Sequence, residues 1–241
     1  GHSYLRRGMI YLSSPITLKN SYIFLNIYIL ITCIFYIIIT THTLINKRFK
    51  KMNDLKNFDF VIYGATGFTG RLVVEYALKQ YSNTDDISWA IAGRNIDKLN
   101  NLKTEMNLSD ETGIIEVDSE DQSSIDNLVE QTKCVLTTVG PYQLYGDKIV
   151  KTCIASGTDY LDLCGEVWWM NKIISECSNQ AKESGARIIF SCGFDSIPFD
   201  LGVLFVQEET MKSFNKYAPS VRGRVRVMNG EFSGGTAASM K

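Results

Sequence analysis

Three glycines at a regular spacing are the residues of this sequence best suited to binding chemistry. Gly64, Gly67 and Gly70 follow the apolar stretch FDFVIY. Glycine lets a chain turn tightly and lets backbone N–H groups approach a phosphate closely. We therefore predict that the turn binds the pyrophosphate of a dinucleotide, the alternative being a plain turn between strand and helix. The residues predicted to contact the cofactor here are Gly64, Ala65, Thr66, Gly67, Phe68, Thr69 and Gly70.

Two polar residues after later apolar runs are predicted to contact the adenosine half of the dinucleotide. Arg94 stands where an acidic residue would hold the ribose 2′-hydroxyl of NAD. A guanidinium pairs with a phosphate dianion instead, so Arg94, helped by Lys98, favours NADP(H) over NAD(H). Asp118 is expected near the adenine amino group. The alternatives are a solvated arginine at the first position and a helix cap at the second.

The turn Gly140-Pro141-Tyr142 ends a further apolar run and is predicted to line the nicotinamide, which reaches this position in dinucleotide-binding sheets. Tyr142, Tyr145 and Asp195 are weak candidates for a catalytic proton donor. The competing explanations are a simple Gly-Pro turn, packing of the tyrosines and helix capping by the aspartate.

The distribution of histidine and cysteine excludes several kinds of site. His2 and His42 both precede the glycine turn, so the folded region is not expected to use an imidazole base or a histidine metal ligand. No tyrosine precedes a lysine by four residues, so the Tyr-x-x-x-Lys pair of short-chain dehydrogenases is absent. The six cysteines include no C-x-x-C pair, and we expect reduced core thiols and no metal site.

Length and charge limit the remaining possibilities. With 241 residues, of which 45% are hydrophobic, the chain can bury a sizeable core. The 25 basic and 26 acidic residues give a formal charge of -1, and the globular part has no long basic stripe. Nucleic acid is therefore not an expected partner.

Short apolar strands that alternate with helices must position these residues. This alternation predicts an α/β fold, a Rossmann-type doubly wound parallel sheet whose ligands lie outside the carboxyl ends of the strands. The strands are expected at Phe60–Tyr63, Ile87–Ala92, Ile114–Val117, Cys134–Val139, Asp159–Leu163 and Arg187–Ser191. The helices are expected at Arg71–Tyr81, Asp97–Met106, Gln122–Gln131, Ile149–Ala155 and Met170–Glu183.

We divide the chain into three parts: an N-terminal extension (1–51), a dinucleotide-binding Rossmann domain (52–210), and the start of an incomplete substrate domain (211–241). Val221–Met228 alternates in the manner of a strand with one wet face, which suggests the beginning of a second, α+β domain. The residues after it are too few to form a core of their own, so we expect a shortened chain.

The extension contains a hydrophobic run at 22–39, in which Asn26 and Thr32 are the clearly polar residues. As a helix it would be roughly 27 Å long, close to the thickness of a bilayer core, which predicts a transmembrane helix. The flanking basic residues slightly favour a cytoplasmic globular part. The alternative is a non-native leader before Met52, in which case the protein would be cytoplasmic.

Five motifs, in order along the chain, resemble the saccharopine dehydrogenase-like oxidoreductases, a group that includes mycobacterial trans-acting enoyl reductases. They are GATGFTG at 64–70, AGR at 92–94, VGPYQLYG at 139–146, DYLDLCGE at 159–166 and CGFDSIPFDLG at 192–202. The resemblance implies a Rossmann domain followed by a substrate domain that GEFSGGTAASM at 230–240 would open. It also implies association of eukaryotic members with membranes and lipid droplets. It supplies no agreed catalytic residue.

These patterns and the resemblance together predict an NADP(H)-dependent oxidoreductase. It would transfer hydride to or from a carbonyl, imine or enoyl group of a small or lipidic substrate. The alternative is a catalytically silent NADP(H)-binding sensor or membrane-tethered scaffold. The expected partners are the nicotinamide dinucleotide, the substrate, a membrane or lipid-droplet surface, and a second copy of the chain.

Overall fold

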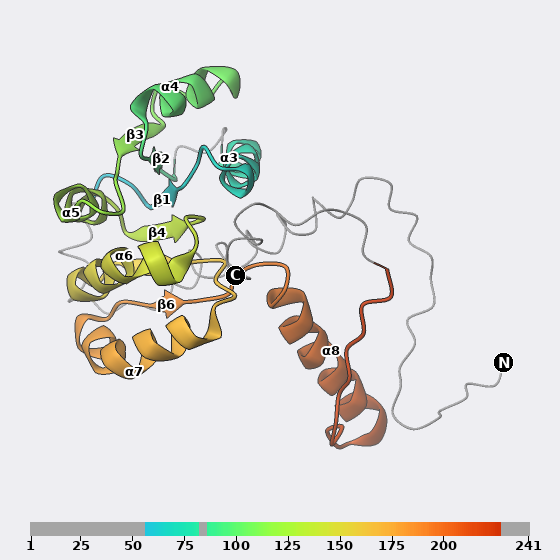
Figure 1. The fold of residues 1–241 in the computed structure, drawn as a ribbon. Helices are drawn as coiled ribbons and strands as arrows, with labels where there is room; N and C mark the ends of the chain where they lie inside the picture. The colour runs from blue at the N-terminus through green and yellow to red at the C-terminus, as the bar shows by residue number, and fades with distance from the viewer. Residues whose placement is uncertain (1–55, 82–85, 228–241) are drawn as a thin grey trace.

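The computed structural model describes residues 56–81 and 86–227, and their strands form one sheet with helices on both faces (Figure 1). The strands are β1 (Phe60–Tyr63), β2 (Trp89–Gly93), β3 (Gly113–Glu116), β4 (Cys134–Thr137), β5 (Asp159–Leu161) and β6 (Ile188–Ile189). Their order is β3-β2-β1-β4-β5-β6, and every neighbouring pair is parallel. The predicted Rossmann-type parallel sheet is thus confirmed.

The described residues include six helices, and all but the last cover the two faces of the sheet in two groups. They are α3 (Phe68–Tyr81), α4 (Ile96–Glu105), α5 (Gln122–Gln131), α6 (Tyr142–Ser156), α7 (Val167–Ser184) and α8 (Ile197–Phe214). One core cluster joins the β1 residue Ile62 to α3 and α4, and the other joins Tyr63 to α5, α6 and α7. Successive residues of β1 thus enter opposite cores, which explains why a buried parallel strand is apolar throughout.

The strand order reverses its direction between β1 and β4. β1 pairs with β2 on one side and with β4 on the other, with Ile62 opposite both Ile91 and Leu136. The chain therefore leaves the carboxyl ends of β1 and β4 toward helices on opposite faces of the sheet. This topological switch point is where ligands bind in open α/β sheets, and the glycine turn and the Gly140-Pro141 turn both begin there.

Four helices begin earlier than the sequence predicts: α4 by one residue, α3 and α7 by three residues each, and α6 by seven. α3 begins at Phe68 rather than Arg71, so Phe68, Thr69 and Gly70 belong to its first turn. α6 begins at Tyr142 rather than Ile149, which places Tyr145 in a helix and not in a loop. The structure stabilises this helix start with the side chain of Glu166, which comes from another loop.

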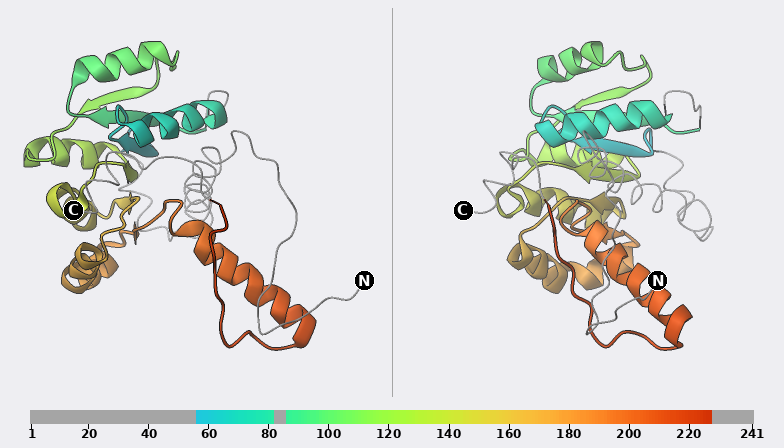
Figure 2. Two further views of the ribbon diagram at one scale, coloured as in Figure 1. Left: turned by 45° about the vertical axis from the view of Figure 1, so that its right-hand side comes forward. Right: turned by 90° about the vertical axis from the view of Figure 1, so that its right-hand side faces the viewer.

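The end of the described chain also differs from the prediction. α8, which was not predicted, runs continuously across the proposed domain boundary at 210 and projects from the rest of the fold in both views of Figure 2. Residues 221–227 form no strand, which contradicts the prediction for Val221–Met228 over the part that is described. Alternation indicates which side chains share a face, but a strand also needs a hydrogen-bonding partner, and no described strand pairs with this segment.

Several predictions lie outside the described residues. These are the extension 1–51, with its predicted span at 22–39, and the motif at 230–240. Within 56–81 and 86–227, no helix combines the length and the hydropathy that crossing a membrane requires.

The cysteines in the described part are core thiols, as predicted. Each is buried and none forms a disulfide; they are Cys134, Cys153, Cys164, Cys177 and Cys192.

Candidate functional site

The glycine turn leads from β1 into α3 and leaves several backbone donors open. The N–H groups of Gly64 and Ala65 both donate to the Ala92 carbonyl, at 2.9 and 3.2 Å, which ties the turn to the end of β2. In contrast, four N–H groups have no acceptor among the described residues; they belong to Thr66, Phe68, Thr69 and Gly70. The first turn of α3 also contains no acidic residue. Open donors at the positive end of a helix dipole form a binding site for phosphate.

Each of the three glycines has a separate structural reason. Gly64 has a φ of +89°, a left-handed conformation that side chains rarely adopt. A Cβ added at Gly70 would lie 2.0 Å from the Gly64 carbonyl oxygen, so α3 packs directly against the turn. At Gly67 the same oxygen would be 3.3 Å away, a tighter than ordinary contact. Gly64 therefore permits the sharp turn, and Gly70 permits the close contact between α3 and that turn.

Arg94 lies exposed directly after the last residue of β2. Its guanidinium forms no hydrogen bond or ion pair with any residue in the described ranges. Lys98 is exposed in the first turn of α4, where its backbone N–H donates to Asn95 Oδ1 at 2.8 Å. The arrangement leaves both cationic side chains accessible at the carboxyl edge of the sheet, next to the strand that holds the glycine turn.

Asp118 organises the turn between β3 and α5. Its Oδ1 accepts the Glu120 N–H at 3.0 Å, and its carbonyl oxygen accepts the Asp121 N–H at 3.1 Å. The N-cap of α5 is Asp121, whose side chain accepts the Ser123 N–H. Asp118 thus shapes the turn without being the helix cap, and its exposed side chain lies at the edge predicted for adenine.

A carboxylate from a different loop closes the start of α6. Glu166 Oε1 accepts the Tyr142 N–H at 2.9 Å, and Glu166 Oε2 accepts the Gln143 N–H at 2.7 Å. The next two N–H groups, those of Leu144 and Tyr145, both donate to the Pro141 carbonyl at 3.1 Å. The four donors that a helix leaves unpaired at its start are therefore all satisfied. Because Glu166 lies 24 residues from Tyr142 along the chain, no local sequence pattern indicates that it caps this helix.

Tyr142 joins the ends of β4 and β5. Its side chain is 5% exposed, and its hydroxyl donates to the Thr137 carbonyl at 3.3 Å while it accepts the Leu163 N–H at 3.1 Å. Burial raises the pKa of this phenol well above its usual value. The other candidates for a proton donor differ: Tyr145 is half-buried on α6, and Asp195 is exposed in the turn before α8.

Asp162 holds the loops after β5 and β6 together. Its side chain is 1% exposed; Oδ1 accepts the N–H groups of Cys164 and Ser191, both at 2.9 Å, and Oδ2 accepts the Tyr160 hydroxyl at 3.0 Å. Burial raises the pKa of this carboxyl to about 6, although the three hydrogen bonds favour its ionised form.

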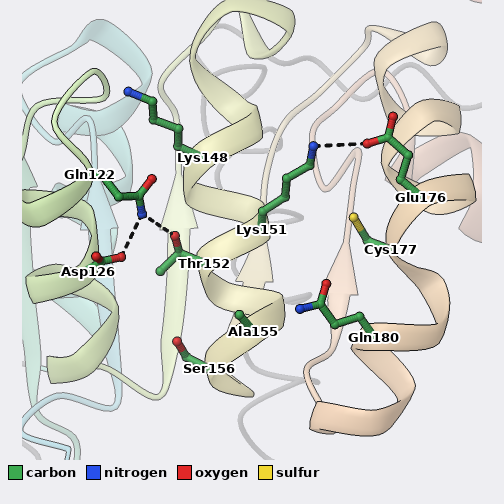
Figure 3. A pocket seen from close by; sticks show the side chains of 10 residues that line it. All are labelled: Gln122, Asp126, Lys148, Lys151, Thr152, Ala155, Ser156, Glu176, Cys177 and Gln180. Atoms are coloured by element: carbon green, nitrogen blue, oxygen red, sulfur yellow. Dashed lines mark hydrogen bonds and ion pairs between the residues drawn. The ribbon is translucent and has the colours of Figure 1, made fainter.

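A polar hollow on the outer faces of α5, α6 and α7 lies apart from these residues (Figure 3). It has a volume of about 600 Å³ and none of the predicted site residues lines it. Several of its side chains are already paired with each other: Gln122 with Asp126 and Thr152, and Lys151 with Glu176. The candidate site is therefore the carboxyl edge around β1 and β4, not this hollow.

Comparison with known proteins identifies the family of this chain. Residues 60–189, more than half of the chain, match the family model for the saccharopine dehydrogenase NADP binding domain. A Caenorhabditis elegans protein named lipid droplet localized protein is 37% identical over 193 residues, 76% of this chain and 44% of that protein. A Mus musculus saccharopine dehydrogenase-like oxidoreductase is 39% identical over 166 residues, 65% of this chain and 39% of that protein.

A further relative and a solved structure extend the comparison. The trans-acting enoyl reductase of Mycobacterium leprae is 41% identical over 151 residues, 62% of this chain and 35% of that protein. Apo saccharopine dehydrogenase (L-Glu forming) from Saccharomyces cerevisiae shares the fold with a TM-score of 0.52 at 17% identity, over 64% of this chain and 32% of that one. The chain matches less than half the length of each of these relatives. With the glycine turn, Arg94 and the switch point all inside the matched residues, the chain belongs to the saccharopine dehydrogenase NADP binding domain family.

Proposed function

We propose that this chain is the cofactor-binding part of an NADP(H)-dependent oxidoreductase, which transfers hydride to or from a carbonyl, imine or enoyl group of a small or lipidic substrate. One observation carries the proposal: at the switch point, four N–H groups around the start of α3 have no acceptor among the described residues, and the Arg94 guanidinium, which pairs with none of them either, follows the neighbouring strand. The names of the mouse and mycobacterial relatives, an oxidoreductase and an enoyl reductase, support the reaction class.

In this proposal the chain binds and orients the cofactor. The open donors of the glycine turn hold the pyrophosphate, and Arg94 pairs with the 2′-phosphate. Asp118 accepts a hydrogen bond from the adenine amino group. Gly140 and Pro141 line the nicotinamide, and Tyr142 holds their turn in place. Bound NADP(H) supplies or accepts the hydride, so the chain contributes mainly by positioning.

The candidates for the proton donor differ in accessibility. The Tyr142 hydroxyl is buried and engaged in two hydrogen bonds, which leaves Tyr145 and Asp195 as the candidates that can reach a substrate. Exchange of Tyr145 for Phe and of Asp195 for Asn tests them separately. We expect one of the two variants to lose turnover while its affinity for NADPH stays unchanged.

Fluorescence titration with NADPH and NADH tests the proposal. The wild-type chain is expected to bind NADPH more tightly. Because a hydrogen-bonded ion pair is worth about 1.5–3 kcal/mol, Arg94→Gln should weaken NADPH binding about 10- to 100-fold and change NADH binding little. Lys98→Gln is the matched control, with a smaller expected loss. If the wild-type chain binds neither dinucleotide, the proposal is wrong; if it binds both equally, the role of Arg94 is wrong.

The burial of the Tyr142 hydroxyl favours a second candidate function, a sensor or membrane-tethered scaffold that holds NADP(H) without turnover. Full-length protein that binds NADPH but oxidises none of it in the presence of lipid and amino-acid extracts would support this alternative. Turnover that a bulky substitution at Gly67 abolishes would support the enzyme.

Association with a lipid surface and self-association are further parts of the proposal. The name of the Caenorhabditis elegans relative supports a lipid-droplet location. Flotation of the natural protein with lipid droplets tests it, and recovery of all the protein in the soluble fraction would contradict it. Analytical ultracentrifugation tests the homo-oligomer.

A further inference from the structure

We infer that Glu166 is a positioning residue for the nicotinamide half of the cofactor and has no part in binding the phosphates. The inference rests on the proposed NADP(H) binding. It starts from a juxtaposition that the chain order hides: Glu166 follows β5, yet its carboxylate holds the first two residues of the helix that follows β4.

The contact has the geometry of a fixed clamp. Each carboxylate oxygen accepts a different N–H group, Oε1 from Tyr142 at 2.9 Å and Oε2 from Gln143 at 2.7 Å. The Tyr142 hydroxyl, 3.1 Å from the Leu163 N–H, forms a second bridge between the same two loops. Gly140 and Pro141 directly precede the clamped residues, so a displacement of the helix start displaces the turn proposed to face the nicotinamide.

The backbone of Glu166 is itself held by hydrogen bonds to its own loop and to α7. Its own N–H donates to Cys164 Sγ at 3.2 Å, and its carbonyl accepts the Met170 N–H at 3.1 Å, which begins α7. The Cys164 N–H in turn donates to the buried Asp162. The clamp therefore connects the β4–α6 turn to a loop that is anchored in the core, as a residue that positions another group requires.

The charge of Glu166 also makes the starts of α6 and α3 differ in their attraction for phosphate. A carboxylate at the start of α6 compensates the positive end of that helix dipole and occupies its donors, so a phosphate gains nothing there. The start of α3, with its open donors, keeps its full attraction for phosphate. A change at Glu166 should therefore act on the nicotinamide half of the cofactor and leave the adenosine half unaffected.

Two ligands distinguish the halves. NADPH contacts the whole proposed site, whereas 2′,5′-ADP carries the adenosine and its 2′-phosphate without the nicotinamide. In Glu166→Gln the amide keeps one acceptor but turns an NH₂ group toward the second N–H, so the clamp loses one bond and its charge. We expect Kd for NADPH to rise about tenfold and Kd for 2′,5′-ADP to stay within a factor of about two.

The matched control is Glu176→Gln, the same exchange within α7, the helix that follows Glu166; the Glu176 carboxylate pairs with Lys151 instead. It should change neither Kd. Glu166→Asp is a second variant that retains the charge but is one methylene too short to reach both N–H groups, and it should show the same selective loss as Glu166→Gln. Binding of 2′,5′-ADP by each variant also reports that the phosphate site is folded.

The outcomes separate this inference from the proposed function. If the wild-type chain fails to bind NADPH and 2′,5′-ADP, the proposed function is wrong. If it binds both and Glu166→Gln binds both equally well, the positioning role is wrong. If both Glu166 variants weaken the two ligands by the same factor, or bind neither, the effect is not confined to the nicotinamide half and the inference is overturned.

Discussion

The N-terminal ends of α3 and α6 begin beside each other in the sheet order, after β1 and β4, and yet they are built in opposite ways. At the start of α3, four N–H groups have no acceptor within the described ranges and no acidic side chain is present in the first turn. At the start of α6, Glu166 accepts two N–H groups and the Pro141 carbonyl accepts the next two. A helix end binds phosphate only where the protein does not supply its own anion.

The two ends also depend on different kinds of residue. The α3 end depends on glycines, because the helix must approach the Gly64 carbonyl closely. The α6 end depends on carboxylates from later in the chain, Glu166 directly and Asp162 through the loop that carries Glu166. The first end should therefore be sensitive to added volume, and the second to charge and pH.

The largest effect is expected from Gly70→Ala at the α3 end. The new Cβ would lie 2.0 Å from the Gly64 oxygen and 2.8 Å from Ala65 Cα, both backbone atoms that cannot rotate away. The helix must therefore shift away from the turn. We expect a loss of about 3 kcal/mol in the free energy of unfolding and of more than about 100-fold in NADPH affinity, measured by denaturant titration and fluorescence.

Gly202→Ala on α8 is the matched control, because a Cβ there meets nothing within 4 Å. It should leave NADPH binding unchanged and slightly stabilise its helix. Binding of NADPH by Gly70→Ala with near wild-type affinity would show that the close contact between α3 and the glycine turn is not needed for cofactor binding.

A dependence of stability on pH is expected from the α6 side. The pKa of Asp162 is about 6 in the folded protein and about 3.8 when unfolded, so between these values the folded state binds more protons. This contribution to stability is fully present below about pH 3.8 and is lost as pH rises through about 6. It amounts to about 3 kcal/mol.

Asp162→Asn isolates that contribution. The amide oxygen can still accept the N–H groups of Cys164 and Ser191, and the NH₂ group can donate to the Tyr160 hydroxyl. The variant should therefore gain stability relative to wild type as pH rises from 4 to 7 in denaturant titrations. A difference between the two proteins that does not change with pH would contradict the buried, raised pKa.

A smaller effect is expected from Gly146→Ala, which adds a methyl group to α6 as Gly70→Ala adds one to α3. Its Cβ would lie 2.5 Å from the ring of Trp169, whose Nε1 donates to Asp147 Oδ1 at 2.7 Å. The Trp169 side chain can move aside, whereas the backbone atoms next to Gly70 cannot. We therefore expect a loss of about 1–3 kcal/mol in the free energy of unfolding. Affinity for 2′,5′-ADP should be unchanged; a parallel loss of that affinity would show that the two helix ends are coupled.

The smallest effect is expected from Gly67→Ala. Its Cβ would be 3.3 Å from the Gly64 oxygen, which a shift of a few tenths of an ångström relieves. The free energy of unfolding should fall by about 1 kcal/mol or less. A loss as large as that of Gly70→Ala would mean that the whole turn, and not one contact, requires glycine.

Much of the fold could be predicted from local patterns. The limits of β1 and α5 match the prediction, because buried parallel strands are apolar throughout and α5 carries its own N-cap, Asp121. The start of α6 could not be predicted in the same way, because its cap lies 24 residues away from Tyr142 along the chain. The sequence patterns did not predict α8, because it buries no residue in the described fold and its apolar residues do not gather on one face of the helix.

The sequence by itself determined the chain order of the strands and of the helices α3 to α7, the glycine turn after β1 and the basic residue after β2, because these features depend on neighbouring residues. Tertiary structure alone decided which helix end stays open for phosphate and which is closed. The physical reason is that Glu166 and Tyr142 become neighbours only when parallel pairing brings β5 beside β4. The spacing of Gly64 and Gly70 is visible in the sequence, but the contact that requires Gly70 is not.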